Sequence, residues 1–321
     1  MKHFIFLILG LFCGLSHGAI TWNFTFEDDA GVGFNEGALG TQRRAVLTEV
    51  TTYINSFIDA DGTIDIAVKK SDTMTGSALA SAGVIYPYGT SAETGSATTT
   101  FRDGFPFTHA NTGTDPSTFP TDTNLTFNFN TITDWNYDSS AASGSGNYDM
   151  FSTALHEFGH ILGIFSLIDS DGSSFYFNRS GGTGLYSEFD RFLVTGSGDR
   201  LINEDGLGIT RFNASTVSEY TGNDIFFDGA NATAANGGAP VRIYAPSSFS
   251  NAASLTHTDP SVFGVMRPTA SRSDFDFRTF SAIELGMLQD IGWQFNVVPE
   301  PSSSMLILLG ATVTFSRRRR A

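Results

Sequence analysis

The segment from Asp149 to Phe165 is the part of the sequence that most restricts the fold. Apolar residues recur in it at helical spacing, and its middle reads His156-Glu157-Phe158-Gly159-His160. Residues four apart lie on one face of an α-helix, so both imidazoles can point at one metal ion. The rest of the chain must therefore fold around one apolar helix that carries His156, Glu157 and His160.

The ends of this helix are also marked in the sequence. Asn147 or Asp149 is placed to cap its first turn. Gly163 follows three residues after His160, where a helix can end in a left-handed residue. These signals agree with a helix over 149–165.

The motif predicts a metal centre with an adjacent base. Imidazole suits zinc, and a catalytic zinc (Zn2+) keeps three protein ligands and one open position for water. Glu157 stands next to the first ligand, where a carboxylate can take a proton from the attacking water and return it to the leaving amine. Glu157 is therefore the predicted general base.

The residues alone leave the third ligand open. A compact pattern with the third ligand six residues after His160 fails, because Ser166 stands there. A Glu ligand on a following helix is not found either, because the next acids, Asp169 and Asp171, lie in a turn-like Asp-Ser-Asp-Gly. Outside the first 18 residues, His109 and His257 are the two remaining histidines, and His109 is expected at the surface or in a cleft.

Segments 149–165 and 254–293 together resemble the leishmanolysin-like metalloproteases. That family shares an HExxHxxG helix, a distant third His, a Met-turn and a Gln-Asp-Leu/Ile-Gly-aromatic element, matched here by Gln289 to Trp293. The resemblance implies Glu157 as general base and Met266 as a supporting residue in a turn beneath the metal. The zinc ligands that it implies are His156, His160 and His257.

The expected architecture is α+β: a zincin, metzincin-like fold with a mixed sheet, an active-site helix and an irregular C-terminal subdomain. The catalytic domain is expected over 19–298, with an N-terminal subdomain over 19–165 and a C-terminal one over 166–298. Alternation and helical spacing predict strands at 20–26, 63–68 and 125–129 and helices at 43–57 and 279–291.

The strand at 125–129 is expected at an edge of the sheet. An edge strand binds an extended peptide by strand addition through backbone hydrogen bonds. Leu125, Phe127 and Phe129 are therefore candidate substrate-binding residues, with less support than the metal ligands.

Both ends of the chain have the features of targeting signals. Residues 1–18 have the positive start, apolar run and small residues of a secretory signal peptide. Residues 299–321 combine Pro-Glu-Pro, a short apolar run and four arginines, which resembles the PEP-CTERM sorting tail of Gram-negative bacteria. That resemblance implies an exosortase-type partner and export to the cell surface, the extracellular matrix or the medium.

Charge narrows the functional classes further. The formal net charge is −15, and removing both ends takes away five basic residues and one acid. Binding to nucleic acid needs a basic face, so this class is excluded. The single cysteine, Cys13, lies in the leader, so no disulfide is expected.

These observations predict an exported zinc endopeptidase whose substrate is an extracellular protein or peptide. Two alternatives remain: a non-catalytic metal-binding surface or matrix protein, and a zinc hydrolase of non-protein amides. A calcium (Ca2+) site has weak support, because the acid clusters Asp59, Asp61, Asp65 and Asp169, Asp171 lack EF-hand spacing. Turn formation explains both clusters.

Overall fold

The computed structural model describes residues 18–86, 101–138, 140, 146–175, 185–204, 210–251, 253–270, 272 and 277–296. Residues 1–17, which make up most of the expected signal peptide, and the C-terminal tail over 299–321 lie outside these ranges. The chain forms a mixed α/β structure with one four-stranded sheet and several smaller ones. None of the helices in the described ranges has the length and apolar composition that crossing a bilayer requires.

The elements are α1 Gly37–Asn55, α2 Phe105–Thr112, α3 Met150–Ile161, α4 Ala230–Ala235 and α5 Ala282–Asp290, with 3-10 turns η1 Gly33–Asn35, η3 Asp190–Phe192 and η4 Val217–Glu219. The strands are β1 Thr21–Phe26, β2 Thr63–Lys70, β3 Ala80–Val84, β4 Phe101–Arg102, β5 Thr123–Phe127, β6 Trp135–Asn136, β7 Tyr148–Asp149, β8 Tyr186–Ser187, β9 Leu193–Thr195, β10 Ile202–Glu204, β11 Thr210–Phe212, β12 Ile225–Phe227 and β13 Val241–Arg242.

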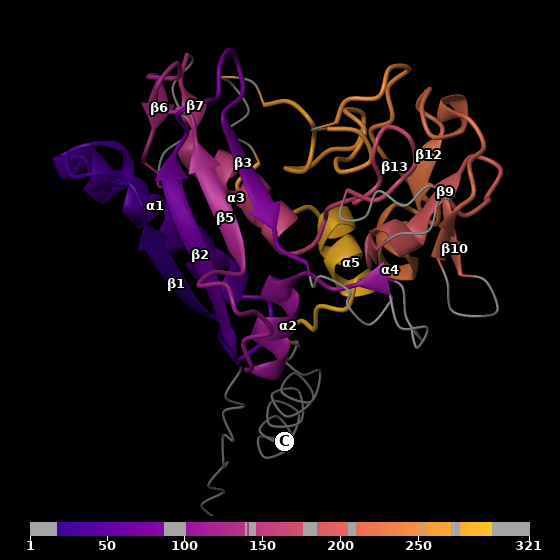
Figure 1. Cartoon of the computed structure of the whole chain (residues 1–321), viewed down its shortest axis with the longest axis horizontal. Coiled ribbons are helices and arrows are strands. Elements are labelled where there is room, and N and C mark those ends of the chain that lie inside the picture. The colour runs from indigo at the N-terminus through magenta and orange to yellow at the C-terminus, as the bar shows by residue number, and fades with distance from the viewer. Residues whose placement is uncertain are drawn as a thin grey trace, which may run out of the picture.

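The largest sheet has the strand order β1-β2-β5-β3 (Figure 1). The first three strands are parallel, and β3 pairs antiparallel with β5 at the edge. In β2, Ile64 and Ile66 are fully buried on one face, because every second side chain of a strand points the same way. On this face α3 crosses the sheet, and Phe158 meets the ring of Trp22 edge-on at 5.3 Å.

The expected edge position of residues 125–129 is wrong. β5 lies between β2 and β3, and the side chains of Leu125 and Phe127 are fully buried. The alternating pattern indicates which side chains are buried, but it does not indicate whether the strand lies inside the sheet or at its edge. These residues therefore have no free strand edge, and β3 occupies the edge instead.

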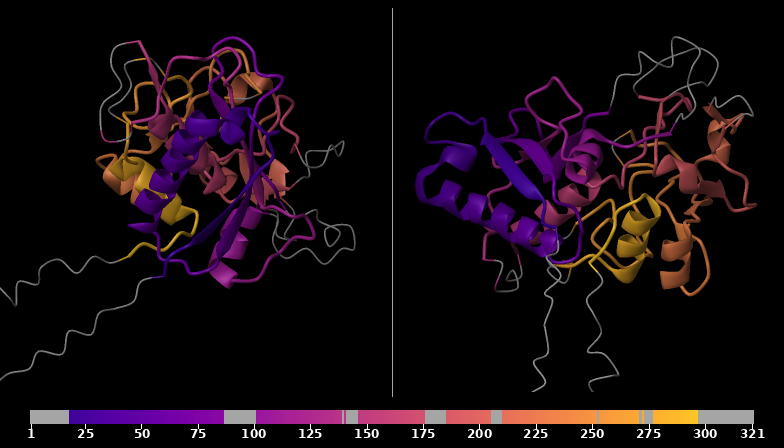
Figure 2. Two further views of the ribbon diagram at one scale, coloured as in Figure 1. Left: turned by 90° about the vertical axis from the view of Figure 1, so that its left-hand side faces the viewer. Right: turned by 90° about the horizontal axis from the view of Figure 1, so that it is seen from below.

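The C-terminal half builds a second layer around α4, α5 and the three-stranded sheet β13-β12-β9. Figure 2 shows α4 and α5 side by side. The carboxylate of Asp290 at the end of α5 accepts hydrogen bonds from the amides of Asn231 and Ala232, at 2.9 Å each. Trp293 then donates from Nε1 to the Leu162 carbonyl at 2.6 Å, so the end of α5 is joined to the end of α3.

Candidate metal centre

Helix α3 begins where the sequence predicts and ends about one turn before the expected Phe165. Asp149 is its N-cap: its Oδ1 accepts a hydrogen bond from the Ser152 amide at 2.7 Å. Arg278 forms an ion pair with the same carboxylate, so the segment before α5 is held to the start of α3. At the other end the helix stops at Ile161, and Gly163 takes a φ of 105°.

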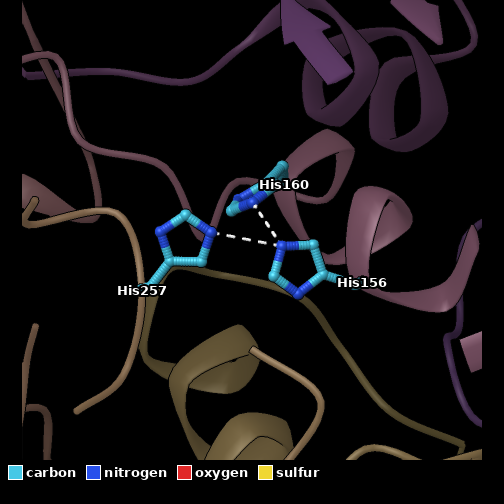
Figure 3. A group of neighbouring side chains, drawn as sticks. All are labelled: His156, His160 and His257. Carbon is cyan, nitrogen blue, oxygen red and sulfur yellow. Dashed lines mark hydrogen bonds between the residues drawn. The ribbon is translucent and has the colours of Figure 1, made fainter. Parts of the chain in front are cut away.

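Three imidazoles converge beside this helix (Figure 3). The Nε2 atom of His156 lies 3.1 Å from Nε2 of His160 and 3.2 Å from Nε2 of His257. The first two rings come from consecutive turns of α3, and His257 comes from the segment after β13. His109 is not among them, so the structure brings together the three histidines that the resemblance implies.

Backbone carbonyls fix the orientation of each ring. The Nδ1 atoms of His156, His160 and His257 lie 2.7 Å, 2.9 Å and 2.9 Å from the carbonyl oxygens of Val265, Ile164 and Ala253. A carbonyl oxygen only accepts, so each Nδ1 carries the proton and each Nε2 keeps a lone pair.

The converging nitrogens fit a divalent cation. Two Nε2 lone pairs repel each other at this separation, and a cation between them removes the repulsion. Burial lowers the pKa of all three imidazoles, that of His257 to about 3, so the rings remain neutral as metal ligands must. Three imidazole nitrogens, with each Nδ1 held by a carbonyl, could hold a divalent ion such as zinc.

Glu157 and the three imidazoles line one cleft. The side chain of Glu157 is 5% exposed, and burial raises its pKa to about 8, while the Ala82 amide of strand β3 acts in the opposite sense. A carboxyl with that pKa is protonated near neutrality. Positive charge at the imidazoles would favour the carboxylate, because an opposite charge within a few ångströms stabilises the ionised form.

The cleft has a volume of about 440 Å³ and lies between β3 and the segment 264–270. Leu79, Ala80 and Ala82 line the β3 side, and Val265 and Arg267 line the other. Both walls therefore belong to segments that the sequence analysis did not assign to substrate binding.

Met266 lies beneath the helix, where the resemblance placed it. Its side chain is fully buried, and a Cβ added at Gly159 would overlap its sulfur. The absence of a side chain at Gly159 lets the methionine reach the underside of α3, between the two helical ligands. Met266 also connects to the third ligand, because its carbonyl accepts a hydrogen bond from the Thr258 amide at 2.9 Å.

Sequence reasoning missed the residue that holds this turn. Glu284 in α5 is fully buried, and its Oε1 accepts a hydrogen bond from the Met266 amide at 2.6 Å. Its Oε2 accepts from the Ser281 amide at 2.7 Å, which closes a capping box. The Ser-x-x-Glu spacing at 281–284 is visible in the sequence as a helix start, but the second bond is not.

The expectation that His109 lies at the surface or in a cleft is wrong for its side chain. His109 is 7% exposed, and its Nδ1 lies 2.9 Å from Asp122 Oδ2. Two acids of the calcium-like clusters accept local or loop hydrogen bonds: Asp59 accepts from the Gly18 amide at 3.1 Å, and Asp171 accepts from the Ser173 amide at 2.9 Å.

Comparison with known proteins identifies one segment. Residues 297–320 match the PEP-CTERM protein-sorting motif. No curated protein and no solved structure matches the chain. The motif makes this an exported protein of a Gram-negative bacterium that is sorted at the cell envelope, with an exosortase recognising its C-terminus.

Proposed function

We propose that this chain is an exported zinc endopeptidase of zincin, metzincin-like architecture. One observation carries the proposal: three neutral imidazoles converge beside Glu157 in a cleft whose wall is an edge strand. The mixed sheet, the distant third histidine and the buried Met266 below α3 agree with that architecture. The proposed halves are the subdomains over 19–165 and 166–298.

His156, His160 and His257 would hold the metal, and Glu157 would act as general base. Zinc, when bound, polarises a substrate carbonyl and lowers the pKa of a water molecule towards 7. Glu157 accepts the proton of the attacking water and then delivers it to the departing amine nitrogen. Its burial beside the cleft keeps bulk water away from this transfer.

Strand β3 is the proposed substrate-binding edge. The Leu79 carbonyl and the Ile85 amide bond to the neighbouring strand segment, at Asn128 and Asp122. Backbone groups alternate along a strand, so those of Ala80 and Ala82 point away from β5 and towards the cleft. The Ala82 amide bonds Glu157, so a peptide would use the Ala80 amide and the carbonyls of Ala80 and Ala82. An extended peptide can add there by backbone hydrogen bonds, which gives affinity with little dependence on sequence.

Delivery to the cell surface, the matrix or the medium would bring the enzyme to an extracellular protein or peptide substrate. The chemistry also suits other amides, so the substrate class belongs to the test. A panel of denatured protein, unstructured peptides and small acyl amides separates the endopeptidase from a hydrolase of non-protein amides.

The decisive comparison uses Glu157→Gln and His160→Ala. Glu157→Gln is expected to keep bound zinc and to lose peptide cleavage by a factor of at least about 10² to 10⁴, the usual contribution of a positioned base. His160→Ala is expected to lose both zinc and cleavage. Undiminished cleavage by Glu157→Gln would overturn the proposal, and a zinc-loaded wild type with no activity on the panel would favour a non-catalytic metal-binding protein.

A further inference from the structure

A second cluster of potential ligands lies at the start of strands β2 and β5. Thr123 of β5 pairs with Ile66 of β2, so Asp122 and Asp65, the residues just before them, lie side by side. The Asp65 amide donates to Asp122 Oδ2 at 2.8 Å. Parallel pairing thus brings together two carboxylates that are 57 residues apart in the sequence.

Helix α2 adds an imidazole to this pair. His109 Nδ1 lies 2.9 Å from Asp122 Oδ2 and 3.6 Å from Asp65 Oδ2. The helix is held against the sheet at this point, because the Gly62 amide donates to the Ala110 carbonyl at 2.9 Å. A Cβ at Gly62 would overlap the His109 carbonyl oxygen, so this close approach requires glycine.

The cluster is short of positive charge. Asp122 is 1% exposed, and burial raises the pKa of its carboxyl. Within the described ranges, no lysine or arginine forms an ion pair with Asp65 or Asp122. A single imidazole supplies at most one positive charge for two carboxylates, and only when it is protonated.

The donor atoms are arranged for a small cation. One imidazole nitrogen and two carboxylate oxygens all lie within 4.8 Å of one another. Asp65 is the most exposed of the three, with a side chain that is 26% accessible, so an ion can enter from that side. A nitrogen ligand with two carboxylates suits zinc or a similar first-row divalent ion better than calcium, which takes six to eight oxygens.

We propose that Asp65, His109 and Asp122 bind a second divalent transition-metal ion, of the zinc type, that has a structural role. The ion would take the place of the proton between His109 and Asp122 and would join α2 to β2 and β5 (Figure 1). These segments belong to a chain whose one cysteine, Cys13, lies in the leader, so metal coordination supplies a cross-link that disulfides do not. The site is independent of the proposed peptidase centre.

Metal stoichiometry tests this inference directly. Zinc per folded chain is measured by elemental analysis after gel filtration for the wild type, Asp65→Asn, His160→Ala and the double variant. The expected result is two ions in the wild type, one in each single variant and none in the double variant. Asp61→Asn is the matched control, because Asp61 is a neighbouring exposed acid outside the cluster, and it is expected to keep two.

Cobalt gives a readout that does not depend on activity. In the His160→Ala background, visible absorption of bound Co2+ is expected to remain and to disappear on adding Asp65→Asn. Zinc is also expected to raise the melting temperature of His160→Ala by several degrees, and this shift should vanish with Asp65→Asn. If Asp65→Asn does not fold, His109→Gln replaces it in the same measurements.

Equal zinc content in the wild type and Asp65→Asn, or no cobalt absorption in His160→Ala, would overturn the second site. Either result would leave the peptidase proposal intact, because that depends on His160 and Glu157. Conversely, an inactive protein that binds two zinc ions would keep the second site and overturn the proposed peptidase activity alone.

Discussion

The carboxylate of Glu284 accepts a hydrogen bond from the Met266 amide at 2.6 Å, across 18 residues of sequence. Glu284 also accepts from the Val265 amide. The Val265 carbonyl in turn receives the Nδ1 proton of His156. One buried carboxylate on α5 therefore sets the position of the turn that orients a metal ligand on α3.

This relationship makes Glu284 a positioning residue. We expect Glu284→Ala to weaken metal binding by about 10- to 100-fold, the usual effect of removing an outer partner of a metal site. Glu284→Gln should weaken it less, because its amide oxygen still accepts the Met266 hydrogen bond. Affinity is measured by competition with a chromophoric chelator, and circular dichroism checks the fold.

Glu219 provides the control for this prediction. It also closes a capping box, at the exposed turn η4. Glu219→Ala should leave metal affinity unchanged. Wild-type affinity in Glu284→Ala would show that the turn keeps its position without the carboxylate.

The contact between Gly159 and Met266 predicts coupled stability effects. Gly159→Ala places a methyl group against the buried Met266 sulfur, and overpacking of this kind costs about 1–3 kcal/mol. Met266→Ala alone opens a cavity and costs about 2–5 kcal/mol. In the double variant the new methyl group enters the space left by the sulfur. The double variant should therefore lose less stability than the sum of the losses in the two single variants.

Urea unfolding of the four proteins measures this coupling. Strict additivity would mean that the two side chains do not meet. Gly146→Ala is not a suitable control, because Gly146 has a φ of 118° and any side chain there is strained. Ser152→Ala, at a half-buried position in the first turn of the same helix, offers a reference for a change in α3 that leaves Met266 untouched.

The sequence reveals the local part of this site and little of the long-range part. His156, Glu157 and His160 follow from helical spacing, and Asp149 and Gly163 follow from capping rules, because these depend on neighbouring residues alone. His257 lies about a hundred residues away, and only a family resemblance selected it over His109. Its position beside α3 depends on tertiary contacts, such as the hydrogen bond from the Ser166 amide to Thr256 Oγ1.

The order of the strands in the sheet is the part of the fold that sequence patterns predicted least well, and the reason is physical. β3 has the sequence Ala-Ser-Ala-Gly-Val, which has low strand propensity. The strand that lies at the edge therefore lacks the residue pattern by which a strand is predicted. β5 alternates strongly because the sheet buries one of its faces, and this holds for an inner strand as well as for an edge strand. The pairing of Asp65 with Asp122 is hidden for a similar reason, since register between distant parallel strands has no local signal.

The edge position of β3 predicts a matched pair of proline variants. Ala80→Pro removes an amide that points away from β5, whereas Ser81→Pro removes one that points towards it. Ala80→Pro should lower kcat/KM for extended peptides by about tenfold, the loss of one substrate hydrogen bond, with little change in melting temperature. Ser81→Pro should lower the melting temperature by several degrees.

Peptide kinetics and thermal unfolding on both variants separate the two effects. Cleavage at the wild-type rate by Ala80→Pro would show that the substrate does not add to β3. A large loss of stability in Ala80→Pro with none in Ser81→Pro would reverse the assigned direction of the two amides.

Asp190 predicts how stability changes with pH. Its side chain is fully buried, and burial raises its pKa from 3.8 to about 6, against hydrogen bonds from Ser166, Leu167 and Ser187. The folded chain therefore binds this proton more tightly than the unfolded chain does. The stabilisation is complete below pH 4 and is lost as pH rises towards 6, by about 3 kcal/mol for a shift of about two pKa units.

Asp190→Asn, which cannot ionise, should lose less stability over this interval. Urea midpoints at half-unit steps from pH 4 to 7 measure the difference, with Asp171→Asn as the control because the pKa of exposed Asp171 is lowered by Ser173. Parallel pH profiles for the wild type and Asp190→Asn would contradict the assignment.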